Sequence, residues 1–290
     1  ERTMAVAYDA LAQYAVQSWD VEYRTNPGRS LMARVYQPQG HGPFPVLLDV
    51  HGGAWNGQDR TANALVDQQL AVSGVLVVAI DLRLASEAPY PASVADTSYG
   101  IRWLKSKAKE WNGDPETLGV LGSSSGGHVA ELIAMRPNDS RYNEFTLEGN
   151  PHLDSTMKYV IARSPVSNTS ARYENAKRRD RKNMMHNNET YFNPWDSIHE
   201  ANPQEILDRG EVVSLPPMFV LQGSLDDNVM PETQAHFVDS YRIAGGDIEF
   251  EVFARAEHRW VHTPSPETDR AIDMMKQYIA SRISVMQLVS

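Results

Sequence analysis

Thr117-Leu118-Gly119-Val120-Leu121-Gly122-Ser123-Ser124-Ser125-Gly126 is the stretch that decides the fold. Its first five residues predict a short buried strand, and residues 127–135 predict a helix. The chain must turn sharply between the two, and glycine suits such a turn because a Cβ would clash with neighbouring backbone. Only Ser124 has glycine both two residues before it and two residues after it. The pattern therefore indicates a nucleophile elbow that exposes Ser124.

Apolar runs alternate with helical patterns along the rest of the chain. The continuous β-rich runs at 45–50 and 75–80 are typical of strands buried on both faces of a parallel sheet. Further strands are predicted at 159–163, 218–222 and 248–253, and helices at 92–109, 231–244 and 267–283. This alternation predicts an α/β fold with a mostly parallel, doubly wound central sheet and helices on both faces.

The N-terminal part of the sequence predicts a helix followed by a β-hairpin. Residues 4–18 are rich in alanine and predict a helix. Residues 19–24 and 31–36 flank Asn26-Pro27-Gly28, which predicts a hairpin turn between two strands.

Composition is typical of one enzyme-sized globular domain. The chain has 290 residues, of which 41% are hydrophobic and 22% charged, so we expect a single domain over residues 1–290. A net charge of −10 argues against nucleic acid or an anionic membrane as a partner. The chain has no cysteine, which excludes disulfides, cysteine nucleophiles and thiolate metal sites. We expect neither a metal ion nor a cofactor.

The sequence gives little information on the cellular location of the protein or on its oligomeric state. No apolar run approaches the roughly 20 residues of a membrane span. We expect a cytoplasmic protein, while the start at Glu1 leaves open a signal peptide that has been removed. The sequence is compatible with a homodimer and does not fix the oligomeric state.

Residues 165–215 interrupt the alternation of strands and helices. The segment is polar and carries the basic run Lys177-Arg178-Arg179-Asp180-Arg181-Lys182. A basic run invites a nucleic-acid interpretation, but in an acidic protein the solvated face of an inserted helix is the commoner explanation. Because the segment falls between two core strands, we expect a cap or lid over the C-terminal edge of the sheet.

A serine hydroxyl needs a base, and the base needs a group that orients it. Asp226 and Asp227 follow the strand predicted at 218–222, and His258 follows the strand at 248–253. The order serine, acid, histidine, with acid and base just past strand ends, is that of α/β-hydrolases. Either aspartate could face the imidazole. His262 could share a helix face with His258, but a third ligand for a metal between them is missing.

The loop His51-Gly52-Gly53-Ala54-Trp55 directly follows the strand at 45–50. Its glycines allow the backbone to approach a substrate closely. We expect the amides of Gly53 and Ala54, together with that of Ser125, to form an oxyanion hole.

These segments resemble the α/β-hydrolases of the hormone-sensitive-lipase-like and BD-FAE-like esterase group. The stretch 81–92, Asp-Leu-Arg-Leu-Ala-Ser-Glu-Ala-Pro-Tyr-Pro-Ala, is similar to the family's Asp-Tyr-Arg-Leu-Ala-Pro-Glu-x-x-Phe-Pro-Ala, and Gly223-x-x-Asp226-x-x-Val229 matches the family's acid loop. The resemblance covers about residues 30–285. It implies that Asp226 rather than Asp227 is the acid, and that Asp96 has a structural role.

The resemblance implies a serine carboxylesterase that acts on a small-molecule ester through Ser124, His258 and Asp226. Activity is expected to rise with pH through an apparent pKa of roughly 6.5–7. Two departures separate the chain from the family pattern: Ala54 replaces a usual third glycine, and Ser123 and Ser125 replace the Asp and Ala of the usual elbow. A ligand-binding receptor on the same fold and an amidase or formamidase stay open as alternatives.

Overall fold

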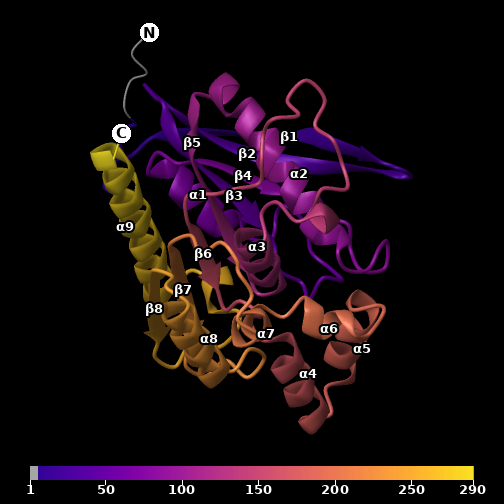
Figure 1. Ribbon diagram of the computed structural model, residues 1–290. Coiled ribbons are helices and arrows are strands. Elements are labelled where there is room, and N and C mark those ends of the chain that lie inside the picture. Colours follow the sequence, from indigo (N-terminus) through magenta and orange to yellow (C-terminus); the bar gives the residue numbers. More distant parts are fainter. Residues whose placement is uncertain (1–5, 290) are drawn as a thin grey trace.

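A computed structural model describes residues 6–289. The fold of these residues is built around one eight-stranded sheet (Figure 1). The strand order is β1-β2-β4-β3-β5-β6-β7-β8. The strands are β1 (Ala15–Asn26), β2 (Arg29–Gln39), β3 (Phe44–Val50), β4 (Leu76–Ile80), β5 (Gly113–Ser123), β6 (Val160–Arg163), β7 (Met218–Gly223) and β8 (Ile248–Phe253).

The sheet is mostly parallel. β1 and β2 form an antiparallel hairpin, and β2 also pairs antiparallel with β4. All other neighbouring strands are parallel, from β4 and β3 through to β7 and β8. Every residue of β3, β4, β6 and β7 is buried, which explains their continuous apolar sequences. The predicted mostly parallel α/β sheet is confirmed.

Helices cover both faces of this sheet. One face packs on α2 (Ala92–Lys107), α3 (Ser125–Met135) and α8 (Pro231–Ile243), and the other on α1 (Ala64–Val72) and α9 (Pro266–Val289). Alternate residues of β3 serve the two faces: Leu48 packs with the first set and Leu47 with the second. The predicted hairpin and the helices α2, α3, α8 and α9 are confirmed, whereas the sequence did not predict α1.

The N-terminal helix prediction is wrong in the described residues. Residues 15–18 begin β1, where Ala15 is paired with Gln39, and residues 6–14 contain no helix; residues 4 and 5 lie outside the described part. Local alanine content is a weak preference, and pairing along the length of β2 overrides it.

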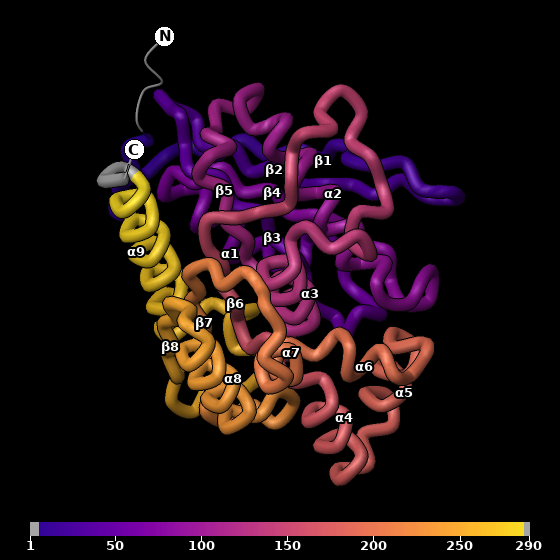
Figure 2. Tube along the Cα trace, viewed as in Figure 1, coloured from indigo at the N-terminus to yellow at the C-terminus, as the bar shows by residue number. Residues whose placement is uncertain are grey.

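The segment between β6 and β7 folds into four short helices. They are α4 (Thr169–Arg178), α5 (Lys182–Tyr191), α6 (Ser197–Glu200) and α7 (Pro203–Asp208). The trace in Figure 2 leaves β6, runs through these helices at the lower right and returns to β7. They lie at the end of the molecule where the parallel strands finish.

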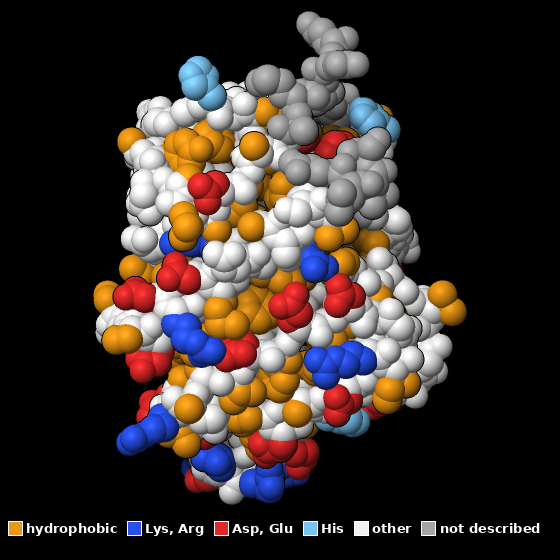
Figure 3. All heavy atoms as spheres, turned by 90° about the vertical axis from the view of Figure 1, so that its left-hand side faces the viewer, with side chains coloured by type: hydrophobic (Ala, Val, Ile, Leu, Met, Phe, Trp, Pro, Cys, Tyr) orange, Lys and Arg blue, Asp and Glu red, His pale blue; other side chains and the backbone are white. Residues whose placement is uncertain are grey.

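The face that carries α9 is shown in Figure 3, where acidic, basic and hydrophobic side chains are interspersed. Among residues 6–289, no helix is both long and apolar enough to cross a bilayer.

Candidate active site

The carboxyl ends of the parallel strands bring the predicted site residues together. The loop containing Gly53 and Ala54 follows β3, and Ser124 follows β5. Asp226 lies three residues after β7, and His258 lies five residues after β8. In an open α/β sheet, these ends meet at one crevice.

Ser124 occupies the strained backbone conformation of a nucleophile elbow. Its φ is 55° and its ψ is −116°, a combination that side chains rarely adopt. A Cβ on Gly122 would lie 2.5 Å from the carbonyl oxygen of Gly126, and a Cβ on Gly126 would lie 2.1 Å from that of Val50. Both glycines are therefore required for the turn, and packing of the turn against β3 maintains the strain.

Ser124, His258 and Asp226 form a continuous hydrogen-bonded chain. Ser124 Oγ lies 2.8 Å from His258 Nε2, and His258 Nδ1 lies 2.7 Å from Asp226 Oδ2. The other carboxylate oxygen, Oδ1, accepts hydrogen bonds from the backbone amides of Asn228 (3.0 Å) and Val229 (2.8 Å). These amides fix the carboxylate, which in turn orients the imidazole.

The electrostatics of the three groups suit a neutral imidazole beside an ionised carboxylate. Burial lowers the pKa of His258 below its ordinary value, and the hydrogen bond to Asp226 offsets only part of that effect. Burial would raise the pKa of Asp226, but its hydrogen bond from His258 and those from the loop amides bring it below the ordinary value. His258 can therefore accept a proton at neutral pH.

Asp227 has a different role from its neighbour. Its carboxylate pairs with Arg181 and with Arg179 (3.2 Å), both from the inserted segment. The backbone oxygen of Asp227 accepts a hydrogen bond from Asn175 on α4 (3.0 Å). The basic run is thus more than a solvated helix face, because two of its arginines bind the loop that carries the acid.

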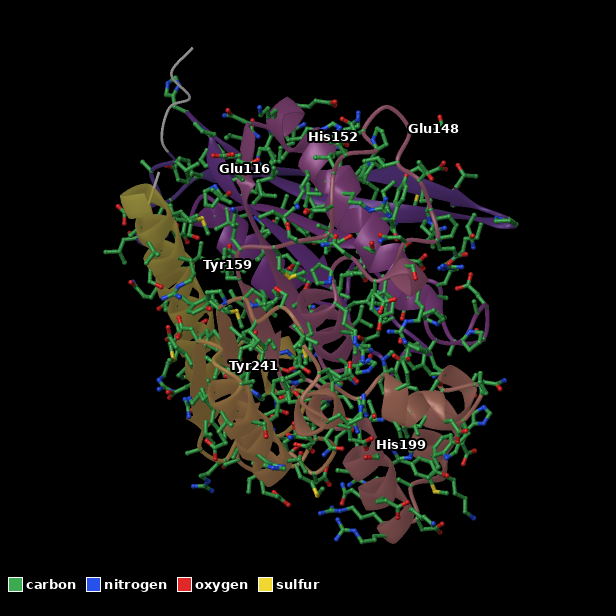
Figure 4. All side chains as sticks on the ribbon, viewed as in Figure 1. Glu116, Glu148, His152, Tyr159, His199 and Tyr241 are labelled. Carbon is green, nitrogen blue, oxygen red and sulfur yellow. The ribbon has the colours of Figure 1, made fainter. Side chains whose placement is uncertain are left out.

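His262 lines the same cavity as Ser124 and is engaged by an arginine. His262 Nε2 lies 3.2 Å from Arg163 Nη2, and burial lowers the pKa of His262 to about 4. Figure 4 shows His199 on α6, where it pairs with Glu205, and His152 at the opposite end of the molecule. The described residues contain no group of three or more His, Asp or Glu side chains that could hold a metal ion.

Two of the predicted oxyanion-hole residues, Gly53 and Ala54, line the same cavity as Ser124, and the third, Ser125, directly follows the nucleophile in the chain. Gly53 and Ala54 both have positive φ, at 101° and 52°, and a Cβ on Gly53 would lie 2.2 Å from the oxygen of Gly57. Within the described part of the chain, the amides of Gly53, Ala54 and Ser125 have no hydrogen-bond acceptor. Ser125 Oγ accepts from the amide of Trp55 (3.1 Å), which ties the loop to the elbow.

Trp55 anchors the inserted segment beside the site. Its ring stacks on Tyr191 of α5, with centroids 4.7 Å apart. Its Nε1 donates to His128 Nδ1 (3.2 Å), and His128 Nε2 donates to the oxygen of Ala201 (2.7 Å). Burial lowers the pKa of His128 to about 4, so this imidazole is neutral and acts as a structural link. The sequence did not assign His128 a role.

Two arginines in the cavity were also missed. Arg163 at the end of β6 and Arg172 on α4 line a cavity of about 170 Å³ together with Ser124 and His258. A larger cavity of about 620 Å³ adjoins it and shares Ala54, Arg172 and Asn228 as lining residues. Neither arginine lies in a motif, so only the three-dimensional structure reveals that they face the nucleophile.

A family model described as BD-FAE matches residues 34–241. The chain belongs to the BD-FAE family. Among curated relatives of this BD-FAE protein, the probable carboxylic ester hydrolase LipM of Mycobacterium tuberculosis is 29% identical over 207 residues, which is 69% of this chain and 46% of LipM. The chain spans about half the length, or less, of the curated relatives it matches.

Solved structures share the fold of this BD-FAE chain at lower identity. Esterase B from Lactobacillus rhamnosis has a TM-score of 0.80 and 20% identity, over 97% of this chain and 90% of that one. Esterase 2 of Thermogutta terrifontis, phosphorylated by paraoxon, has a TM-score of 0.70 and 19% identity, over 91% of this chain and 94% of that one. These likenesses show the α/β-hydrolase fold, as the resemblance in the sequence implies.

Proposed function

We propose that this protein is a serine carboxylesterase that hydrolyses small-molecule esters. The observation that carries the proposal is the unbroken chain from Ser124 Oγ through His258 to Asp226, with links of 2.8 and 2.7 Å. Membership of the BD-FAE family and the names of the relatives, which are esterases and a probable ester hydrolase, support the same reaction class.

The proposed reaction begins at Ser124. Its Oγ attacks the ester carbonyl while its proton passes to His258 Nε2, and Asp226 holds the Nδ1–H tautomer that leaves Nε2 free to accept. The amides of Gly53, Ala54 and Ser125 donate to the oxyanion, each contributing on the order of 3 kcal/mol. His258 then protonates the leaving alcohol. Water, deprotonated by His258, attacks the acyl carbon; the bond to Ser124 Oγ then breaks, His258 returns the proton to Oγ, and the acid leaves.

The inserted segment 165–215 is proposed to act as a cap on this site. Its support is local: Arg172 contributes to the wall of the catalytic cavity, and Asp180, Lys182 and Met184 line the adjoining outer cavity. The cap would then decide which esters reach Ser124, while the loops at the strand ends perform the chemistry.

Labelling and turnover together test the reaction class. A fluorophosphonate should add a single label to the wild-type protein at Ser124; esterase 2 of Thermogutta terrifontis, which shares the fold, is phosphorylated by paraoxon. Ser124→Ala should abolish labelling and lower kcat for a p-nitrophenyl ester by about 10⁶ if the three residues act as a unit.

Ser123→Ala is the matched control, because Ser123 neighbours the nucleophile and lies outside the proposed triad. It should keep the label. Near-normal hydrolysis by Ser124→Ala would refute the assignment. A wild-type protein that neither labels nor hydrolyses any ester would instead indicate a ligand-binding protein on this fold.

A further inference from the structure

The wall of the catalytic cavity carries positive side chains that form no ion pair with a described carboxylate. Three arginines line it, Arg163, Arg172 and Arg259, and its described lining includes no aspartate or glutamate. The protein as a whole has a net charge of −10, and its α9 face mixes acidic and basic side chains (Figure 3). A concentration of one sign at the site is therefore a local feature of the cavity.

Arg259 is exposed to water, and of the two buried arginines Arg172 is the less satisfied. Its side chain is 4% exposed, and its Nε donates to Asn228 Oδ1 (2.9 Å). Its Nη1 is enclosed without an acceptor, and no described residue accepts from Nη2. Its guanidinium lies 5.5 Å from the Trp55 ring, a contact that compensates for lost water only in part. No carboxylate within the described chain forms an ion pair with it, and the attraction of Asp226 offsets the effect of its burial only in part.

Arg163 adds a second fixed charge from the other side of the elbow. It is 3% exposed and donates only to neutral acceptors: Ser123 Oγ (3.3 Å), the backbone oxygen of His258 (3.0 Å) and His262 Nε2 (3.2 Å). The resemblance to the family places aspartate where Ser123 stands, and a carboxylate there would neutralise Arg163. With serine there, Arg163 has no ion-pair partner among the described residues, and the attraction of Asp226 and Asp49 offsets the effect of its burial only in part.

A buried arginine without a partner is not in itself a binding group. Arg102 on α2 is also buried without a carboxylate, and it lies over the ring of Tyr99 at 5.7 Å. What distinguishes Arg172 is its place in the wall shared by the catalytic cavity and the outer cavity, close to where the ester must bind. Burying an unpaired charge costs several kcal/mol, and a ligand anion would recover part of that cost.

From this arrangement we propose that the substrate is an ester that also carries a carboxylate, and that Arg172 binds this carboxylate while Ser124 attacks the ester. The planar guanidinium suits the two oxygens of a carboxylate, and Arg163 favours the same charge through its field. The small inner cavity places the carboxylate only a few bonds from the ester carbonyl. This inference rests on the proposed esterase function and names its substrate class.

Wild-type kinetics give the first test, with pairs of esters that differ only in charge. p-Nitrophenyl hemiglutarate is compared with its methyl ester, which places the carboxylate on the acyl side. 3-Carboxyphenyl acetate is compared with its methyl ester, which places it on the alcohol side. In one pair at least, kcat/KM should be about 10–100-fold higher for the charged ester. Equal or faster hydrolysis of the neutral ester in both pairs would overturn the proposal.

Variants then assign the preference to a residue. Arg172→Gln should lower the ratio of charged to neutral kcat/KM by about 10–100-fold, and Arg172→Lys, which keeps the charge without the fork, should lower it less. Arg270→Gln is the control, since Arg270 is an exposed arginine paired with Glu251 on β8 and should leave the ratio unchanged. If Arg172→Gln slows both esters by the same factor, Arg172 acts on packing or on the oxyanion, and the proposal is wrong.

A binding measurement separates this inference from the reaction class. Ser124→Ala cannot turn over, so monomethyl glutarate and dimethyl glutarate can be titrated into it while the melting temperature is followed. The monoanion should stabilise the protein more than the neutral diester, and Arg172→Gln in the same background should remove the difference. This result would support the anion site even in a protein that hydrolyses nothing. No greater stabilisation by the monoanion would refute the site even in an active esterase.

Discussion

Two clusters in this molecule each combine a buried aspartate with two buried arginines. They differ in which groups donate hydrogen bonds to the aspartate. Asp96 on α2 accepts hydrogen bonds from Arg24 Nη2 (2.6 Å), Arg83 Nε (3.0 Å) and the Arg83 amide (2.7 Å). Asp226 accepts from His258, from the side-chain amide of Gln222 and from backbone amides, while Arg163 and Arg172 nearby form no ion pair with it.

The pKa values of the arginines reflect this difference. Burial alone would lower the pKa of Arg83, but hydrogen bonds to Glu144 and Asp96 raise it above its ordinary value. Burial lowers the pKa of Arg172 to about 10, because the attraction of Asp226 compensates only in part. The Asp96 cluster is internally neutralised and holds the hairpin to α2. In the cluster around Asp226, the carboxylate accepts a hydrogen bond from His258, while Arg163 and Arg172 form no ion pair with it and line the cavity.

The largest expected effect comes from exchanging carboxylate for amide at Asp226. Asp226→Asn should leave the fold intact and lower kcat by about 10⁴, because an amide no longer selects the imidazole tautomer that accepts the Ser124 proton. Asp227→Asn is the matched neighbour; it loses only exposed pairs with Arg179 and Arg181 and should change kcat about tenfold or less. Steady-state kinetics on one p-nitrophenyl ester measure both. Equal losses in the two variants would contradict the assignment of Asp226.

The same exchange at Asp96 should affect stability instead of chemistry. Asp96→Asn leaves Arg24 and Arg83 buried without their shared carboxylate and should cost about 3–5 kcal/mol of unfolding free energy. Arg172→Gln removes a charge that forms no ion pair and that Asp226 attracts only in part, so it should cost about 1 kcal/mol or less. Denaturant unfolding of both variants measures the contrast. A loss at Arg172 as large as that at Asp96 would mean that Arg172 is a structural residue.

The two clusters also differ in how far the sequence predicted them. Ser124, Asp226 and His258 could be predicted because each follows a strand end in a recognisable local motif, and the structure brings all three within hydrogen-bond distance. Asp96 was assigned a structural role through the family resemblance, and its two ion pairs agree with that assignment.

Arg163 and Arg172 could not be found in this way. Their role depends on which side chains surround them after folding, and a sequence shows neither the burial of a guanidinium nor the absence of its carboxylate. The same holds for Asp67, a buried carboxyl group whose pKa is raised by burial and which no motif in the sequence marks. Motifs specify local geometry, whereas the charge of a cavity is a property of several elements at once.

The smallest expected effect is on the pH dependence of kcat/KM. It tests whether the charges of the arginines change the pKa of the base, His258. Burial lowers the pKa of His258, and the positive charges of Arg163 and Arg172 contribute in the same direction because they disfavour the imidazolium. His258 must be neutral to accept the Ser124 proton, so kcat/KM for a neutral ester should rise with pH and reach half its plateau below the ordinary histidine value of about 6.5. This midpoint is lower than the sequence alone suggests.

Arg172→Gln removes one of the charges that oppose protonation, so the midpoint should move upward, toward the ordinary histidine value. Arg270→Gln, which is remote from the cavity, should leave the midpoint where it is in the wild type. Rate profiles between about pH 5 and 8 on the same neutral ester measure the three proteins. An unchanged or lower midpoint in Arg172→Gln would show that its charge does not reach His258, and would limit the role of Arg172 to direct contact with the substrate.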